Sequence, residues 1–564
     1  MRSSVHSAAL PSSCSWLAAA IDGSRMLVTS AAGSIAAASQ EQLDGNAAEW
    51  TLDRISCYEG AQAGAANDHA ALERRRETSE IGFDGLLAQH RRAWAARWED
   101  ADIRIDGDPE LQLAVRLALF HMMASVAVDG EAAVGARGLT GGGYRGHVFW
   151  DSDVYVLPFL AATHPPAARA MLEYRVRRLP AALRAARAAG RAGARFPWES
   201  ATAGDEVTPS LAPDHSGRLR PVHTGRLAEH IVADVAWAAA HYIDWTGDKV
   251  FASGPGLELL VQTARYWASR IELDDEGRGH IRDVIGPDEY HEHVDDNAYT
   301  NVMARWNLRR AADAAGGALD DAERRRWLEL GEALVDGYDP LTAVYEQFAG
   351  FHTLEPLVIA DIAPRRPVDA DQLLGAARTH ASQVVKQPDV LMLHYLIPEE
   401  VAPGSLTANL DFYEPRTALG STLSPGVHAA LLARAGRLDQ ALELLHLTAR
   451  IDLDDIAKVT ADGLHLATMG SLWRSLALGF AGLRPTAGRL AIDPIPVPGL
   501  DALELRTRFR GSRVRICITQ DTAEVAATPP ISVLTPDGTT VEVGPTTRTF
   551  DLSPTTTEKN RQAR

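Results

Sequence analysis

Hydrophobic positions recur at helical spacing along most of the chain. From about Pro109 onward, apolar residues three and four apart predict one helix after another. The predicted helices cover residues 109–128, 150–163, 165–190, 225–246, 254–271, 299–315, 321–337, 371–382, 423–435, 437–449 and 466–482. Chemically unusual residues lie only in alternate loops between them. This arrangement indicates paired helices closed into a toroid.

Both ends of the chain depart from the helical pattern. From Leu490 the sequence changes to short alternating runs such as ALELRTRFR and SRVRICITQ, separated by Asp-Gly turn signals, which are typical of a small β-sandwich. Residues 73–100 are charged and periodic and predict a connecting helix. Before them, EWTLDRISCYEG contains Trp50, Leu52 and Ile55 and suggests one or two strands.

Charge and composition narrow the class of protein. The chain of 564 residues has a formal net charge of −18 and a pI near 5.5, which argues against nucleic acid and anionic membrane surfaces as partners. No window approaches the run of about 18 apolar residues that a membrane span needs. Cys14, Cys57 and Cys517 predict neither a disulfide framework nor a cysteine metal site. We therefore expect a cytoplasmic enzyme that acts on neutral ligands.

The segment RDVIGPDEYHEHVDDNAYTN, residues 282–301, is the strongest chemical signal. Gly286 and Pro287 end regular structure, so its carboxylates should lie on a loop. Crowded carboxylates favour one that holds its proton near neutral pH, as acid catalysis requires. The acidic residues are Asp283, Asp288, Glu289, Glu292, Asp295 and Asp296. A metal loop or a plain acidic surface turn remains the alternative.

Two further loops place an aromatic residue beside a carboxylate. YRGHVFWDSD contains Trp150 and Asp151, and FPWESA contains Trp198 and Glu199. An aromatic face can cover the C–H side of a pyranose, and a carboxylate can accept hydrogen bonds from its hydroxyls. The alternative for the first loop is a core tryptophan followed by a helix N-cap aspartate.

Donors and hydroxyls gather in two more loops. KQPDV supplies Lys386 and Gln387, which can hold sugar hydroxyls or an anion. GSTLSPGVHA places Ser421 and Thr422 just before a predicted helix, where hydroxyls and free backbone N–H groups form an anion site. Simple capping and an exposed lysine are the alternatives. The run Gly141–Gly143 lacks the Gly-Lys-Ser/Thr of a P-loop and is assigned to backbone flexibility.

Taken together and in order, six motifs resemble glycoside hydrolase family 65, which contains maltose, trehalose and kojibiose phosphorylases and some hydrolases. They are GYRGHVFWDSDVYVLPF, RFPWESATAGDEVTP, DVIGPDEYHEHVDDNAYTNVMARWNL, KQPDVLML, FYEPRTALGSTLSPGVHAALLA and DGLHLATMGSLWRSLALGFAGLR. The resemblance covers roughly residues 80–550. It implies a mainly α protein: an (α/α)6-barrel catalytic domain, a C-terminal β-sandwich and a short remnant of an N-terminal β domain.

The resemblance also implies boundaries and roles. The N-terminal remnant would cover 1–70, the linker helix 71–105, the barrel 106–484, the sandwich 485–553 and a disordered tail 554–564. Glu289 would be the proton donor, and Trp150 and Asp151 would hold the glucosyl unit. Lys386 and Gln387 would contact substrate, and Ser421 and Thr422 would match the phosphate loop.

Two departures from the family pattern matter. Members usually carry a large N-terminal β-sandwich, and only about 60 residues stand in that place here. Relatives commonly have a histidine before the phosphate loop, where this chain has Leu419. Replacement of that donor weakens the expectation of tight phosphate binding.

Three functions follow as hypotheses. The first is inverting phosphorolysis of an α-linked glucosyl disaccharide, with inorganic phosphate as co-substrate and no metal or other cofactor. The second is an inverting α-glucosidase or trehalase, with Glu414 in FYEPRT as the base that activates water. The third is a catalytically weak sugar-binding protein. We expect a small carbohydrate partner and leave open whether the chain forms a homodimer.

Overall fold

The structure, a computed structural model, describes residues 36–39, 54–57, 68–213 and 217–552. Two compact units divide the chain, residues 1–99 and 100–564. In the first unit, β1 (Ala36–Ser39) and β2 (Arg54–Cys57) pair antiparallel. Helix α1 (Asp68–Ala101) confirms the predicted connecting helix and bends at Gly82, whose φ is 70°. The strand expectations at Trp50 and Leu52, and the tail 554–564, lie outside the described residues.

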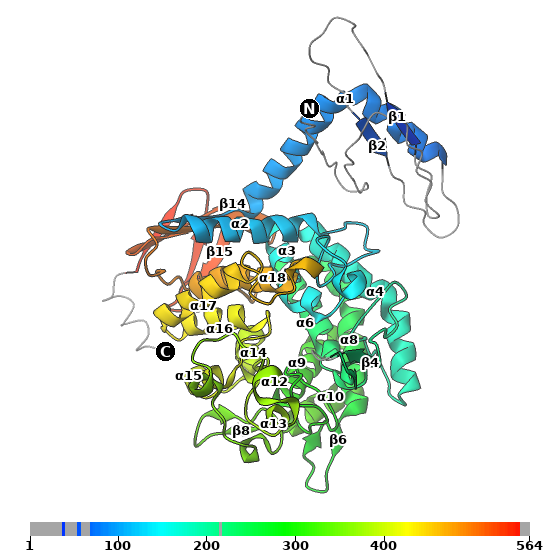
Figure 1. The fold of residues 1–564 in the computed structure, drawn as a ribbon, viewed down its shortest axis with the longest axis vertical. Coiled ribbons are helices and arrows are strands. Elements are labelled where there is room, and N and C mark those ends of the chain that lie inside the picture. Colours follow the sequence, from blue (N-terminus) through cyan, green and yellow to red (C-terminus); the bar gives the residue numbers. More distant parts are fainter. Residues whose placement is uncertain (1–35, 40–53, 58–67, 214–216, 553–564) are drawn as a thin grey trace, which may run out of the picture. The chain divides into compact units, whose positions relative to one another are not determined.

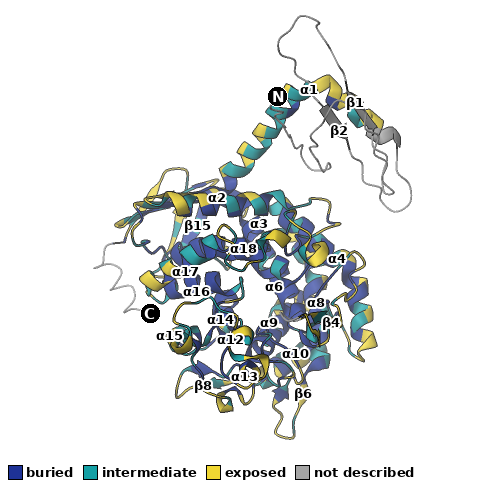
Figure 2. Ribbon diagram, viewed as in Figure 1, coloured by how far each residue is buried: buried dark blue, intermediate teal, exposed yellow. Residues whose placement is uncertain are grey.

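Within the second unit, a closed ring of helices forms the core. Each inner helix contacts the next, and the last contacts the first (Figure 1). In order, they are the π-helical turn η2 (Ser152–Val156) continued by α3 (Leu157–Thr163), α6 (Ile231–Thr246), α9 (Ala298–Ala315), α14 (Asp389–Leu396), α16 (Ser424–Arg434) and α18 (Leu466–Arg474). These helices are almost wholly buried (Figure 2).

Partner helices pack outside this ring. They are α2 (Pro109–Ala124), α4 (Pro165–Ala188), α8 (Pro255–Arg270), α10 (Asp321–Ala333), α15 (Leu406–Tyr413) and α17 (Leu438–Arg450). Their exposed faces alternate with buried ones, as amphipathic helices require. The predicted toroid of paired helices is therefore confirmed as an (α/α)6-barrel. Among the described residues, no helix combines the length and apolar character needed to cross a membrane.

The helix predictions fail in three places, of which the first is the range 225–246: it is two helices, α5 (Thr224–Leu227) and α6, separated by residues 228–230. The range 371–382 is two short helices, α12 (Ala370–Leu374) and α13 (Ala376–His380), separated by Gly375 with a φ of 81°. Helices α14 and α15 were not predicted at all. Every residue of α14 is buried, so its sequence DVLMLHYL carries no polar face and no helical periodicity.

The C-terminal region is a two-sheet β structure, as predicted. One sheet has the order β10-β11-β15-β16, from β10 (Arg484–Thr486) and β11 (Arg489–Ala491) to β15 (Ile531–Leu534) and β16 (Thr540–Val543). The other has the order β17-β14-β13-β12-β3, formed by β17 (Arg548–Asp551), β14 (Thr522–Thr528), β13 (Ser512–Ile518), β12 (Ala502–Phe509) and β3 (Ile103–Asp106). Because β3 pairs antiparallel with β12, residues 103–106 belong to this sheet and not to a linker.

The inner helices share one direction, because each returns through an outer helix. Tyr299 near the start of α9 reaches Asp234 in the first turn of α6, and Thr468 near the start of α18 reaches the loop before α16. Their first turns therefore meet at one end of the barrel, which we call the N-terminal pole. The opposite end is the C-terminal pole. Helix dipoles make the N-terminal pole favourable for anions.

Candidate active site

Asp288 anchors the acidic loop at the N-terminal pole. Its buried carboxylate accepts hydrogen bonds from the backbone N–H of Lys386 at 2.7 Å and from the Gln347 amide at 2.7 Å. It also lies 2.6 Å from Nδ1 of His291. The backbone N–H of Asp288 in turn donates to Asp389 at 2.7 Å. These contacts fix the backbone on the N-terminal side of Glu289.

Asp389, the first residue of α14, is the second half of this anchor. Its other carboxyl oxygen accepts from the Asn297 amide at 2.6 Å. Burial, helped by the nearby charge of Asp288, raises the pKa of Asp389 well above its usual value. A Cβ on Gly286 would meet this carboxyl oxygen at 2.0 Å, so the loop requires glycine there. The acidic loop is thus locked onto the first turns of α9 and α14.

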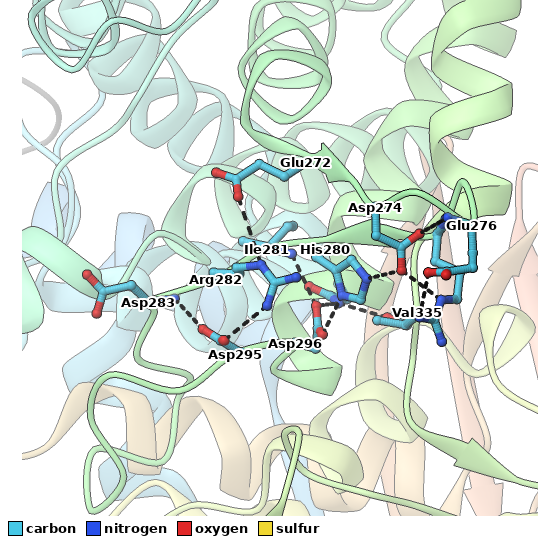
Figure 3. A network of polar contacts seen from close by, with 12 residues as sticks. Glu272, Asp274, Glu276, His280, Ile281, Arg282, Asp283, Asp295, Asp296 and Val335 are labelled. Atoms are coloured by element: carbon cyan, nitrogen blue, oxygen red, sulfur yellow. Dashed lines mark hydrogen bonds and ion pairs between the residues drawn. The ribbon is translucent and has the colours of Figure 1, made fainter.

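A chain of polar contacts ties the two ends of the loop together (Figure 3). His280 bridges Asp296 at 2.7 Å and Asp274 at 3.1 Å, and hydrogen bonding to Asp296 raises the pKa of His280 despite its partial burial. Arg282 contacts Asp295 at 3.3 Å, and the carboxylate of Asp295 accepts from the backbone N–H of residue 283 at 3.0 Å. Asp295 and Asp296 therefore hold the loop and are not free for catalysis.

Glu289 is the acid that the family resemblance predicts, and its partner, Lys386, comes from another loop. Asp283 is engaged by His293 at 2.6 Å and by Arg226 at 3.3 Å, while Glu292 lies 4.0 Å from His223. Together with the anchoring roles above, this accounts for the other five carboxylates. Glu289 instead projects toward Lys386.

Glu289 and Lys386 form a short ion pair with both side chains partly open, at 26% and 32% exposure. Burial alone would lower the pKa of Lys386, but the adjoining Glu289 carboxylate outweighs it and raises that pKa above its usual value. Gln387 follows with a side chain that is 4% exposed. Among the described residues, its amide has no hydrogen-bond partner. The structure thus brings the predicted KQPDV donors beside the predicted acid.

Asp151 faces the same space. Its side chain makes no capping hydrogen bond, so the helix-cap alternative is not what the structure shows. Enclosure by protein raises the pKa of Asp151 to about 7; the charge of Glu289 adds to this, and that of Arg137 opposes it. Tyr144 is 54% exposed. Partial burial raises the pKa of its hydroxyl above the usual value, the charge of Lys386 opposes this rise, and the charges of Asp151 and Glu289 add to it. The loop 137–151 and the acidic loop therefore converge.

Trp150 and Trp198 meet around one buried histidine. Their rings pack edge-on against His230, with centroids at 5.1 and 5.5 Å. Nδ1 of His230 lies 2.7 Å from Asp234, which also accepts from the Tyr299 hydroxyl at 2.6 Å. Trp150 is 1% exposed and Trp198 8% exposed. Both rings are therefore largely enclosed by protein, and their role in holding a sugar stays a prediction.

Glu199 is likewise held rather than open. One of its carboxyl oxygens lies 2.6 Å from Nδ1 of His147, and the side chain is 8% exposed. An antiparallel bridge between Val148 and Ser200 joins the two aromatic–carboxylate loops through 2.9 Å hydrogen bonds. The two loops therefore lie side by side. Of their carboxylates, Asp151 is the one left for a ligand.

The predicted anion loop lies next to the acid. The first turn of α16 has no side-chain cap, and Ser421 and Thr422 just before it are partly exposed. Ser424 donates to the backbone oxygen of Lys386 at 3.0 Å, which links this loop to the Glu289 partner. A Cβ on Gly420 would meet the backbone oxygen of residue 368 at 2.3 Å, so glycine permits the close approach. The geometry can hold an anion within the same site.

Leu419, which precedes the predicted phosphate loop, and Glu414, the candidate base of a hydrolase, are both held by contacts within the protein. Leu419 is 3% exposed and has a φ of 58°, so its side chain packs inward. The Glu414 carboxylate accepts from Arg366 at 2.5 Å, and the same guanidinium donates to the backbone oxygens of Glu414 at 2.6 Å and Thr417 at 2.9 Å. This triple contact fixes the segment before the anion loop and occupies the proposed hydrolytic base.

Several supporting residues had no recognisable sequence signal. Arg137, His230, Arg366 and Asp389 reach the site only because the fold brings distant segments together. The Gly141–Gly143 run gave a signal that was misread as flexibility: a Cβ on Gly141 would meet the backbone oxygen of residue 462 at 2.4 Å. Among the described residues, no group of three or more His, Cys, Asp or Glu side chains is arranged to hold a metal ion.

Comparison with known proteins agrees with this architecture. Residues 116–474 match the model of the glycosyl hydrolase family 65 central catalytic domain, and residues 483–544 match that of the family's C-terminal domain. A solved structure named "Putative kojibiose phosphorylase from human microbiome" superposes with a TM-score of 0.81. The match covers 92% of this chain and 74% of that one at 23% identity, which shows the shared fold.

Two relatives define the level of sequence similarity. The kojibiose phosphorylase of Halothermothrix orenii is 37% identical over 467 residues, which is 79% of this chain and 59% of that protein. The α,α-trehalose phosphorylase of Thermoanaerobacter brockii is 33% identical over 473 residues, again covering 59% of its length. The chain therefore spans about three fifths of the curated relatives it matches. By its catalytic and C-terminal domains, the chain belongs to glycosyl hydrolase family 65.

Proposed function

We propose that this protein catalyses inverting phosphorolysis of an α-linked glucosyl disaccharide of the kojibiose or trehalose type. The observation that carries the proposal is the adjacency of acid and anion loop. Lys386 pairs with Glu289 through its side chain and accepts from Ser424, in the first turn of α16, through its backbone oxygen. One residue thus links the proton donor to the phosphate loop.

The reaction follows from this placement. Glu289 protonates the glycosidic oxygen, and the bond from that oxygen to C1 of the glucosyl unit breaks. Phosphate held by Ser421, Thr422 and the first turn of α16 attacks C1 from the opposite face. The products are β-glucose 1-phosphate and the released glucose. Because phosphate is itself the nucleophile, no second catalytic carboxylate is needed.

Substrate positioning falls to Asp151 and Gln387. The Asp151 carboxylate is enclosed by protein without a side-chain partner among the described residues, so it strongly favours a hydroxyl donor. Gln387, which follows Lys386 in the chain, offers both a donor and an acceptor. The names of the kojibiose and trehalose phosphorylases among the relatives support a disaccharide of two glucose units.

A hydrolytic reaction is the second candidate, favoured by the loss of a donor at Leu419. It needs Glu414 to deprotonate water, whereas Arg366 occupies that carboxylate. We expect Glu414→Gln to keep phosphorolysis within about tenfold of the parent, because the amide oxygen still accepts from Arg366 and takes no proton in the reaction. Initial rates with and without phosphate check this. Complete loss of turnover would instead support Glu414 as a base.

The phosphate loop gives a separate test. We expect the double variant Ser421→Ala with Thr422→Val to raise the KM for phosphate about tenfold or more, since each hydroxyl contact to an anion contributes about 1.5–3 kcal/mol. The KM for the disaccharide should change little. Steady-state kinetics with each substrate varied in turn separates the two constants. Equal increases in both would contradict a phosphate-specific role.

The substrate class is tested by incubation with kojibiose, trehalose, nigerose and maltose, each with and without phosphate. Phosphate-dependent consumption of at least one of them is expected. If none of the four disaccharides is consumed, with or without phosphate, the proposed enzymatic function is rejected. The remaining hypothesis is then a sugar-binding protein.

A further inference from the structure

A cavity of about 330 Å³ lies at the C-terminal pole, away from Glu289. Its walls come from the ends of α6, α9, α14 and α18 and from strand β10 of the C-terminal region. Along α6, His230 at one end contacts the Trp150 cluster and Trp245 at the other lines this cavity. At 1.5 Å per residue, that separates the two sites by roughly 20 Å. The volume lies in the range of small-molecule sites.

Tryptophan rings dominate the lining: Trp237, Trp245, Trp306 and Trp473. The indole N–H groups of the first two are already satisfied, by the backbone oxygens of Leu396 at 3.2 Å and of residue 508 at 2.5 Å. His241, which also lines the cavity, stacks on one face of Trp237 at 4.7 Å, so the remaining tryptophan surface forms the apolar walls for a ligand. Such walls suit the C–H faces of a pyranose.

Two arginines on this lining lack carboxylate partners. Arg474 donates to the backbone oxygen of Tyr395 at 3.1 Å and stacks on that ring at 4.0 Å, and one of its terminal nitrogens has no partner. The side chain of Arg484 has no hydrogen-bond or ion-pair partner among the described residues. Burial, followed by repulsion from Arg474, lowers the pKa of Arg484 to about 10. Two like charges are thus held together, and Glu399 offsets part of their repulsion without forming an ion pair among the described residues.

The acids on the lining do not balance them. The carboxylate of Asp244 accepts a hydrogen bond from Arg310 at 2.6 Å. The lining therefore has one remaining carboxylate, Glu399, for the two positive charges of Arg474 and Arg484. Helix dipoles would favour cations at this pole. However, the last carbonyls of α14 already accept from Arg474 and Trp237, so they do not neutralise Arg484. The cavity therefore combines aromatic walls with an unpaired guanidinium.

We propose that this cavity binds a second ligand, a pyranose carrying an anionic group. A phosphate or carboxylate would pair with Arg484 beside Arg474, because guanidinium binds both in a bidentate manner. The sugar ring would lie among the tryptophans. This inference stands on the cavity alone and does not depend on the reaction at Glu289.

The test is calorimetric titration of the full chain with glucose 6-phosphate, glucuronate, glucose and inorganic phosphate. We expect one or both anionic sugars to bind, and to bind at least tenfold more tightly than glucose or phosphate alone. Arg484→Gln should weaken that binding about tenfold or more, as loss of a charge-assisted contact predicts. The matched control is Arg489→Gln, on the neighbouring strand, where the arginine donates to Thr540 at 2.9 Å.

Stability separates ligand binding from a structural role. Because the Arg484 side chain has no protein partner among the described residues and is repelled by Arg474, Arg484→Gln should leave the melting temperature of the ligand-free protein unchanged or raise it. The double variant in the phosphate loop, Ser421→Ala with Thr422→Val, should retain the binding, which places it outside the active site. Failure of both anionic sugars to bind, unchanged affinity in Arg484→Gln, or equal affinity for phosphate alone would overturn the proposal.

Discussion

Glu289→Gln should abolish cleavage of unactivated disaccharides while leaving the fold intact. The amide cannot protonate a departing alkoxide, so we expect a loss of at least about 10²–10⁴-fold, the range of general acid catalysis. The ion pair with Lys386 is partly open at 26% and 32% exposure, and such pairs contribute little more than about 1 kcal/mol. Steady-state rates and a thermal melt of the same preparation provide the two measurements.

Glu292→Gln is the matched control, since Glu292 lies three residues further along the same loop. Its carboxylate lies 4.0 Å from Nε2 of His223, which is a weak contact. Its turnover should stay close to that of the parent. If Glu289→Gln retained near-native turnover, or if both variants lost it equally, the assignment of Glu289 as the acid would be wrong.

Asp151→Asn should lower kcat/KM for the disaccharide and yet raise the stability of the protein at alkaline pH. The amide of this variant keeps one acceptor oxygen but loses the charge that strengthens a hydrogen bond to a sugar hydroxyl. A charged hydrogen bond contributes about 1.5–3 kcal/mol and a neutral one about 1 kcal/mol, and a difference of about 1–2 kcal/mol corresponds to a fall in kcat/KM of roughly 5–30-fold. Rates over a range of disaccharide concentrations measure it.

The stability effect follows from the pKa of Asp151, raised from 3.8 to about 7. An acid whose pKa is raised in the folded state retains full stability below its unfolded pKa and loses it as pH rises toward the folded value. The parent should therefore lose stability between about pH 4 and pH 7, and the asparagine variant should not share that loss. Melting temperatures of parent and variant that differ little near pH 4 and more at pH 8 are expected. A variant less stable at pH 8 would contradict this account of Asp151.

Long amphipathic helices and alternating strands were predictable because burial on one face leaves a periodic pattern. Helices such as α4 and α8 appear close to their predicted ranges for this reason. Helix α14 was missed since it is buried on all sides and only eight residues long. Strand β3 was assigned to a linker because its partner, β12, lies about 400 residues away in sequence.

Composition and spacing predicted the site as a set of loops, whereas the roles of single residues came only from the family resemblance. Composition identified the acidic loop, yet it could not show that Asp288 is an anchor whereas Glu289 pairs with Lys386. That distinction depends on Lys386, Gln347 and Asp389, whose contacts with the loop exist only in the folded chain. Similarly, the sequence shows that Trp150 adjoins Asp151 but not that the ring is buried against His230.

The barrel itself explains why these loops share one place. Six inner helices run in one direction, so their first turns, with unpaired N–H groups, gather at the N-terminal pole. This arrangement favours a phosphate near α16 and positions an acid from the loop before α9. The C-terminal pole is left for the second cavity and for packing against the β structure.

The central claim is that phosphate, and not water, attacks the glucosyl carbon with inversion. The direct test is an NMR spectrum of the reaction with kojibiose or trehalose and phosphate, recorded before the products mutarotate. We predict β-glucose 1-phosphate in equal amount to released glucose, and no cleavage when phosphate is omitted. Free glucose as the sole product, formed at the same rate without phosphate, or glucose 1-phosphate of α configuration, would contradict the account.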